Sequence, residues 1–164
     1  DRLDGPIHFG RAHWPGARLD LLMRETVVPA CSPGLRQKFG IETATDLRKA
    51  PLVHLDSRPD AWARWFEAQG LDASAPRGMQ LDQFALAAQA AIAGLGVALL
   101  PRFLIESELA CNDLVLAAGR PMESAEAYYL AWPESRTAYP PLQAFRQWLL
   151  KESVDPSVQG PERS

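Results

Sequence analysis

Short apolar runs alternate with helical patterns along the 164-residue chain, an order that is typical of an α/β fold. Apolar runs that end at Gly, Pro or Ser predict strands, and we expect them over residues 3–9, 25–30, 51–56, 79–81, 97–100, 114–117 and 128–132. Apolar positions with a 3.6-residue period predict helices over residues 33–40, 43–50, 57–69, 84–93 and 103–110, and from about residue 140 onward.

Residues with capping preferences support two of the helix starts. Ser32 is suited to cap a helix that has Pro33 at its first position. Asp82 stands where an N-cap belongs, ahead of the Ala-rich stretch 84–93. This stretch is apolar nearly all round, so we expect its helix to be buried.

Aromatic residues cluster in the helix expected over 57–69. Trp62, Trp65, Phe66 and Gln69 fall on one helical face, which is compatible with an aromatic ligand box or with a hydrophobic core. Helical spacing next to a strand favours the core. Trp14 stands in a Trp-Pro-Gly turn, where it either borders a cleft or fills a core.

Composition excludes several classes of protein. The chain is 47% hydrophobic and 23% charged, as globular domains are, and its net charge of −3 offers no basic surface for nucleic acid. It has no apolar run of membrane-spanning length and no signal-peptide pattern at the N-terminus. Cys31 and Cys111 are far apart and form neither a metal-binding spacing nor a disulfide framework, so we expect a cytoplasmic protein.

Eight stretches, in order, resemble the effector-binding region of LysR-type transcriptional regulators, in the subgroup typified by the glycine-cleavage activator and the β-lactamase regulator. The resemblance covers about residues 1–150. The matching stretches are LDGPIHFGR followed by WPG, VPACSP, TDL before PLVH, WARW, LDQF, AGLGVALLP, YYL and FRQWL.

The resemblance implies a periplasmic-binding-protein-like fold of two α/β lobes that hold a small effector between them. It assigns residues 1–25 and 105–150 to an incomplete lobe I and residues 26–104 to lobe II. Residues 151–164 are expected to form a disordered tail, because the end of the chain is polar and rich in Pro, Ser and Gly. In the family a winged helix-turn-helix module precedes this region and makes the DNA contacts. Because that module and the first elements of lobe I have no counterpart here, we expect an N-terminally truncated chain. The resemblance also implies self-association through effector domains.

Arg11 and Tyr128 are candidate effector ligands. Arg11 follows a strand that ends at Gly10, and its guanidinium can bind a carboxylate through two hydrogen bonds. The alternative is a solvated loop residue that pairs with a nearby Asp. Tyr128 and Tyr129 point to opposite faces of a strand, and the resemblance favours Tyr128 as the ligand contact. A half-buried sheet tyrosine is the alternative.

Gln83, Phe84 and Ser32 are the other candidate ligands. A helix that begins near Asp82 presents free N–H groups to an anion, while Gln83 adds a hydrogen bond and Phe84 an apolar wall. In the alternative interpretation, Asp82 only caps the helix and Phe84 belongs to the hydrophobic core. Ser32 has a hydroxyl that could contact a ligand, but a plain helix cap is favoured.

The sequence does not predict an enzyme, a cofactor or a metal site. Cys31 lies between a strand and a helix, a setting that can lower a thiol pKa, and His8, His13 and His54 are possible bases, yet no pairing is indicated. His54 lies in an apolar strand, which favours a structural role.

The function that the sequence predicts is effector sensing in a LysR-type regulator. The effector is expected to be a small, anionic metabolite such as an amino acid or another carboxylate, and we expect no membrane partner. Two other readings stay open: a solute-binding protein of a transporter, and a non-functional truncated remnant.

Overall fold

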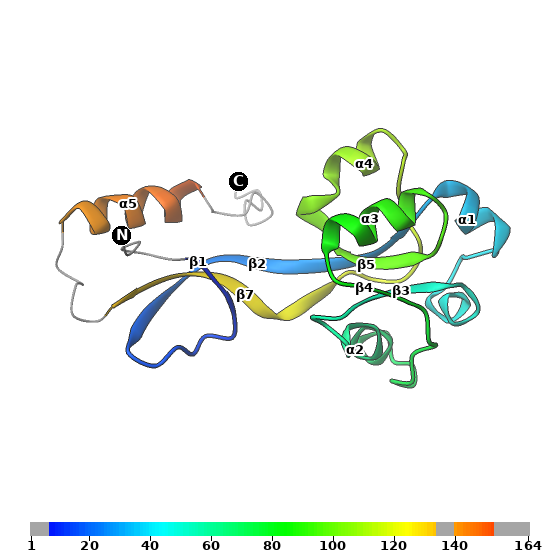
Figure 1. The fold of residues 1–164 in the computed structure, drawn as a ribbon, viewed down its shortest axis with the longest axis horizontal. Helices are drawn as coiled ribbons and strands as arrows, with labels where there is room; N and C mark the ends of the chain where they lie inside the picture. The colour runs from blue at the N-terminus through cyan, green and yellow to red at the C-terminus, as the bar shows by residue number, and fades with distance from the viewer. Residues whose placement is uncertain (1–6, 134–139, 153–164) are drawn as a thin grey trace, which may run out of the picture. The chain divides into compact units, whose positions relative to one another are not determined.

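The computed structural model describes residues 7–133 and 140–152, which belong to two compact units. The first unit takes residues 1–25 and 124–164, and the second takes residues 26–123. Two strands, β2 (Ala17–Cys31) and β7 (Met122–Pro133), run from one unit into the other (Figure 1). The chain therefore crosses between the units twice.

The sheet of the second unit contains parallel strands, and its hydrogen-bonded neighbours follow the order β2-β5-β3-β4, with β6 beside β2. The strands β3 (Leu52–Leu55), β4 (Met79–Leu81) and β5 (Val97–Pro101) are parallel. Both β2 and β6 (Val115–Leu116) run antiparallel to their neighbours. The helical elements are α1 (Pro33–Lys38), the 3₁₀ helix η1 (Ala44–Lys49), α2 (Ala61–Ala68), α3 (Phe84–Ile92), the 3₁₀ helix η2 (Arg102–Leu104) and α4 (Glu106–Ala110).

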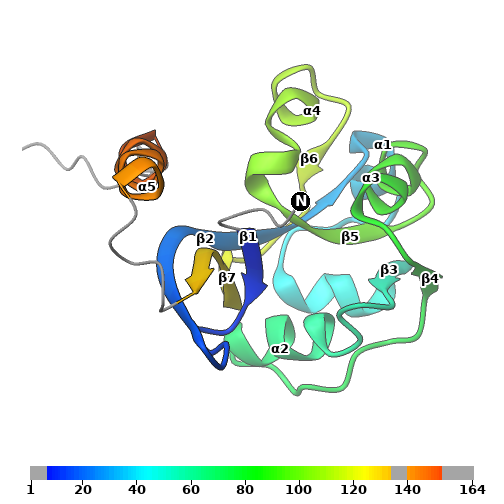
Figure 2. The ribbon, with the colours of Figure 1, turned by 60° about the vertical axis from the view of Figure 1, so that its left-hand side comes forward.

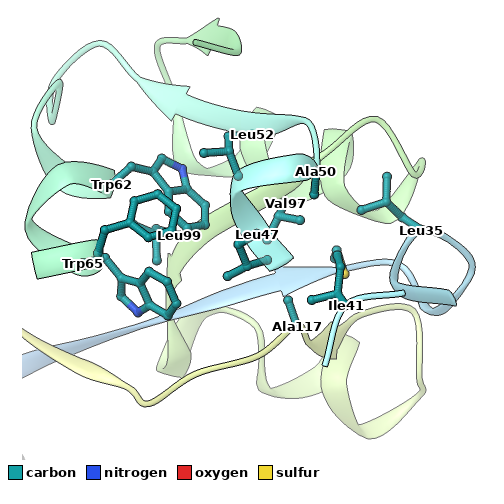
Figure 3. Close-up of a cluster of buried hydrophobic side chains, with 12 residues drawn as sticks. Leu35, Ile41, Leu47, Ala50, Leu52, Trp62, Trp65, Val97, Leu99 and Ala117 are labelled. Atoms are coloured by element: carbon teal, nitrogen blue, oxygen red, sulfur yellow. The ribbon is translucent and has the colours of Figure 1, made fainter. Parts of the chain in front are cut away.

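Two hydrophobic clusters cover the two faces of this sheet. Alternate residues of β5 divide between them: Val97 and Leu99 belong to the first, Ala98 and Leu100 to the second. The first cluster receives side chains from α1, η1 and α2 (Figure 3), and the second from α3 and α4. Figures 1 and 2 show α3 and α4 on one side of these strands and α2 on the other.

The aromatic face of α2 supplies the largest side chains of the first cluster. Trp62, Trp65 and Phe66 are buried there and make edge-to-face and tilted ring contacts. The interpretation as core, rather than as a ligand box, is confirmed.

The first unit contains β1 (Ile7–Gly10), the first part of β2, most of β7 and α5 (Pro140–Glu152). β1 pairs antiparallel with β7, with Ile7 opposite Leu130 and Gly10 opposite Ala127. Helix α5 is joined to β2 by Arg146, which donates to both carboxylate oxygens of Asp20 at 2.8 and 2.7 Å.

Most predicted elements are confirmed, but two strands are longer than expected and α2 begins at Ala61 rather than at residue 57. β2 begins at Ala17 rather than at residue 25, and β7 begins at Met122 rather than at 128. The added stretches mix polar with apolar residues because they are only partly buried, and their extended form depends on neighbouring strands. The expected strand residues 3–6 lie outside the described residues.

Helix α3 corrects two expectations. Its N-cap is Gln83, so Asp82 lies one residue before the cap. Its burial is also one-sided: Ala87, Ala90 and Ala91 face the sheet, whereas Leu86 is 47% exposed. Small side chains let the helix lie close to the strands, but only one face of a helix can contact a sheet.

The boundary of the second unit also differs from the one predicted at residue 104. Ile105 and Leu114 are buried in the second cluster and Ala117 in the first, so residues 105–123 pack with the second unit. The predicted tail begins two residues too early, since α5 continues to Glu152. The rest of that tail, residues 153–164, lies outside the described residues.

Candidate ligand-binding site

The carboxyl ends of the parallel strands define one edge of the second unit. β3, β4 and β5 end at Leu55, Leu81 and Pro101, and the antiparallel register places Val27 of β2 opposite Pro101 at the same edge. In open α/β sheets, ligands bind outside the carboxyl ends of the strands. The segments that follow these strands are therefore the candidate site.

The N-terminus of α3 lies at this edge. Gln83 has an extended backbone, and its carbonyl accepts the first hydrogen bond of the helix, from the Ala87 N–H at 3.1 Å. Its exposed side chain makes no capping hydrogen bond. The N–H groups of a first helical turn lack partners within the helix and carry partial positive charge, so this end favours an anion.

Arg58, which the sequence patterns do not single out as a candidate, lies against Phe84. The Arg58 guanidinium is 4.6 Å from the centroid of the half-buried Phe84 ring, a cation–π distance. The loop after β3 is held by the Arg58 N–H, which donates to the Leu55 carbonyl at 2.9 Å. Arg58 stands three residues after the end of β3, and Gln83 stands two residues after the end of β4. This similar position just after a strand is the signal that could have identified Arg58.

Ser32 lies at the opposite edge of the same unit. It follows the end of β2, whose residue Ala30 pairs with Ala98 near the start of β5. Its Oγ accepts a hydrogen bond from the Leu35 N–H at 3.2 Å and so caps α1. The favoured interpretation as a helix cap is confirmed, and Ser32 is not grouped with Gln83 and Phe84.

Arg11 and Tyr128 belong to the first unit. Tyr128 lies opposite Phe9 in the β1–β7 pair, and the two ring centroids are 4.8 Å apart. Arg11 is exposed in the turn that follows Gly10, and its carbonyl accepts from the His13 N–H at 2.7 Å. The Arg11 side chain is thus available to an anion in solution. The Trp14 carbonyl closes the next turn by accepting a hydrogen bond from the Ala17 N–H. The centroid of the Trp14 ring lies 4.9 Å from that of the His8 ring.

Cys31, the possible nucleophile, and His54, one of the three possible bases, are both structural. Cys31 is fully buried, and the desolvation raises its pKa to about 11, against a smaller opposing effect of Arg36. The suggestion that its strand-to-helix position lowers the pKa is therefore wrong. His54 is 8% exposed, with Nε2 3.0 Å from the Pro76 carbonyl oxygen, so its structural role is confirmed.

The raised pKa of Cys31 predicts a clear difference between the two thiols. At pH 8, iodoacetamide should modify the exposed Cys111 and leave Cys31 unmodified, because burial blocks access and the thiolate is scarce. Mass spectrometry of the native protein should show one adduct, and the same reaction in guanidinium chloride should show two. A second adduct on the native protein at a similar rate would contradict the buried position of Cys31.

Within residues 7–133 and 140–152, no group of His, Cys, Asp or Glu has the arrangement to hold a metal ion. In the same residues, no helix has the length and apolar character needed to cross a membrane.

The carboxyl edge of the parallel strands, the helix that starts there and the two strands that cross between the units are features of α/β ligand-binding folds. Residues 1–153 match the LysR substrate binding domain, and the chain belongs to this family.

Curated relatives of the chain are transcriptional regulators. It is 35% identical to the glycine cleavage system transcriptional activator of Escherichia coli K12 over 94% of this chain and 51% of the activator. It is 34% identical to the transcriptional activator AmpR of Rhodobacter capsulatus over 93% of this chain and 52% of AmpR. The chain therefore spans about half the length of these relatives, none of which is named as an enzyme.

A solved effector domain has the same fold. The structure of the AmpR effector domain of Pseudomonas aeruginosa superposes with a TM-score of 0.79 at 30% sequence identity, over 92% of this chain and 72% of that one. The predicted family and fold class are confirmed.

Proposed function

We propose that the chain is the effector-sensing part of a LysR-type regulator and that it binds a small, anionic metabolite, such as an amino acid or another carboxylate. The observation that carries this proposal is the match to the LysR substrate binding domain over residues 1–153. The resemblance to the family implies that such an effector is held between two lobes.

The edge of the second unit supports an anionic effector. The uncapped start of α3 and the nearby Arg58 both favour negative charge, and Phe84 offers an apolar surface. Gln83 can donate through its side-chain amide. In the first unit, Arg11 can bind a carboxylate through two N–H groups and Tyr128 can donate through its hydroxyl. We propose these five side chains as effector ligands.

A binding screen tests the proposal. Amino acids and small carboxylates are added to the chain, and a genuine effector should raise the melting temperature in a concentration-dependent way, since it binds the folded state only. Isothermal titration then gives the dissociation constant. The loss of one charged hydrogen bond in Arg58→Ala or Arg11→Ala should weaken binding by about 10-fold or more. Arg77→Ala, at an exposed position of the same unit as Arg58, is the control and should leave the affinity unchanged.

Two outcomes would count against the proposal. Unchanged affinity in Arg58→Ala and Gln83→Ala would remove the α3 edge from the site. A cooperative melt that no small anion shifts would count against an anionic effector, and the lack of a cooperative melt would favour a non-functional remnant.

Further parts of the proposal concern the whole regulator. We propose that effector domains self-associate, and that DNA is bound only through a winged helix-turn-helix module of the kind the resemblance implies. A regulator of this kind acts in the cytoplasm, where two free thiols such as Cys31 and Cys111 stay reduced. Sedimentation of the chain with and without the effector would test self-association.

A further inference from the structure

The segment that leads from β6 into β7 is held by side chains of two helices. At its start, the Ala117 N–H donates to the Pro29 carbonyl at 2.8 Å, and Arg36 of α1 donates through Nε to the Ala117 carbonyl at 3.0 Å. At its end, both backbone polar groups of Arg120 bind residues of the α2 region.

Gln69, the residue that follows α2, makes the central contact. Its Oε1 accepts from the Arg120 N–H at 2.9 Å, while its Nε2 donates to the Arg120 carbonyl at 3.1 Å. The same carbonyl accepts from Trp65 Nε1 at 3.2 Å. One amide side chain thus pairs with the backbone of Arg120 as a neighbouring strand would.

Close packing fixes the residue before this pair. Gly119 has a φ of +79°, and a Cβ at this position would lie 2.5 Å from Cζ2 of Trp65. Only glycine therefore lets the segment lie against the buried indole. Hydrogen bonds and packing together attach residues 117–120 to the second unit.

This attachment lies immediately before the division between the units. The chain passes from the second unit to the first between Glu123 and Ser124, three residues after Arg120. We propose that Gln69 is a positioning residue: it clamps Arg120 so that any bending between the units along β7 is confined to residues 121–124. This rests on the proposed function, because a two-lobe sensor responds by a change in lobe arrangement.

Removal of the clamp should loosen this connection without unfolding the second unit. In Gln69→Ala, we expect hydrogen exchange of the Arg120 amide to rise about tenfold, as for the loss of one hydrogen bond, while the amides of β3 and β5 keep their rates. We also expect a broader distribution of distances between the two units. Gln89→Ala, the same change at an exposed site of α3, is the matched control and should alter neither quantity.

Pulsed electron paramagnetic resonance gives that distribution. Spin labels are placed at Arg18→Cys in the first unit and Lys49→Cys in the second, in a Cys111→Ser background in which Cys31 stays buried. Gln69→Glu is the second variant: it keeps the size and the acceptor for the Arg120 N–H but loses the donor to the Arg120 carbonyl, so it should also broaden the distribution.

The outcomes separate a positioning role from a merely local contact. Faster exchange at Arg120 with an unchanged distance distribution in both variants would overturn the proposal, as would unchanged exchange. No effector is added in this experiment, so its failure leaves the binding screen unaffected, and an empty screen leaves the clamp unaffected.

Discussion

Trp65→Ala is expected to lower the free energy of unfolding by about 3–5 kcal/mol, the usual cost of truncating a buried aromatic side chain. Trp65 is fully buried, its ring lies 5.4 Å from that of Phe66 and 5.6 Å from that of Trp62, and its Nε1 donates to the Arg120 carbonyl. The variant leaves a cavity in the first cluster and removes one hydrogen bond. Small domains are stable by roughly 5–15 kcal/mol, so much of that margin would be lost.

Urea denaturation at 25 °C, followed by circular dichroism, measures this loss. The chain supplies a matched control in Trp148→Ala, because Trp148 of α5 is 57% exposed. That variant should cost less than about 1 kcal/mol, as exposed substitutions generally do. Equal losses in the two variants would show that Trp65 is not a core residue.

A fragment of residues 26–123 is expected to fold by itself and to unfold cooperatively. Both hydrophobic clusters of the second unit draw all their buried members from within this range. Its sheet is covered on both faces and keeps the pairings of β2 with β5 and β6, and of β3 with β4 and β5. At about a hundred residues, such a unit is large enough for a core of its own.

The test is a urea titration of the fragment beside the full chain. We expect a single transition. Its m-value, the slope of the unfolding free energy against urea concentration, should match the surface that a folded domain of this size exposes on unfolding. Trp62→Ala within the fragment should shift the midpoint to lower urea, since Trp62 is 1% exposed and its Nε1 donates to the Val53 carbonyl at 2.8 Å. A broad, gradual loss of signal would show that the second unit depends on the rest of the chain.

The candidate site illustrates how far local patterns reach. The position of Gln83 and Phe84 at a sheet edge could be predicted from sequence, because a strand followed by a helix places the helix start at such an edge. Arg58 could not be identified, because its position over the Phe84 ring depends on how the loop after β3 crosses toward α3. Ser32 has the same helix-start character as Gln83, yet the antiparallel course of β2 puts it at the opposite edge.

The sequence by itself determined the helices, the buried strands, the cap at Ser32, the aromatic core face of α2 and the family, because these depend on the spacing of residues near one another in the chain. Only the tertiary structure decided the full lengths of β2 and β7, the one-sided burial of α3, the inclusion of residues 105–123 in the second unit and the pairing of Gln69 with Arg120. These features depend on contacts between residues distant in sequence, whose energies no local pattern contains.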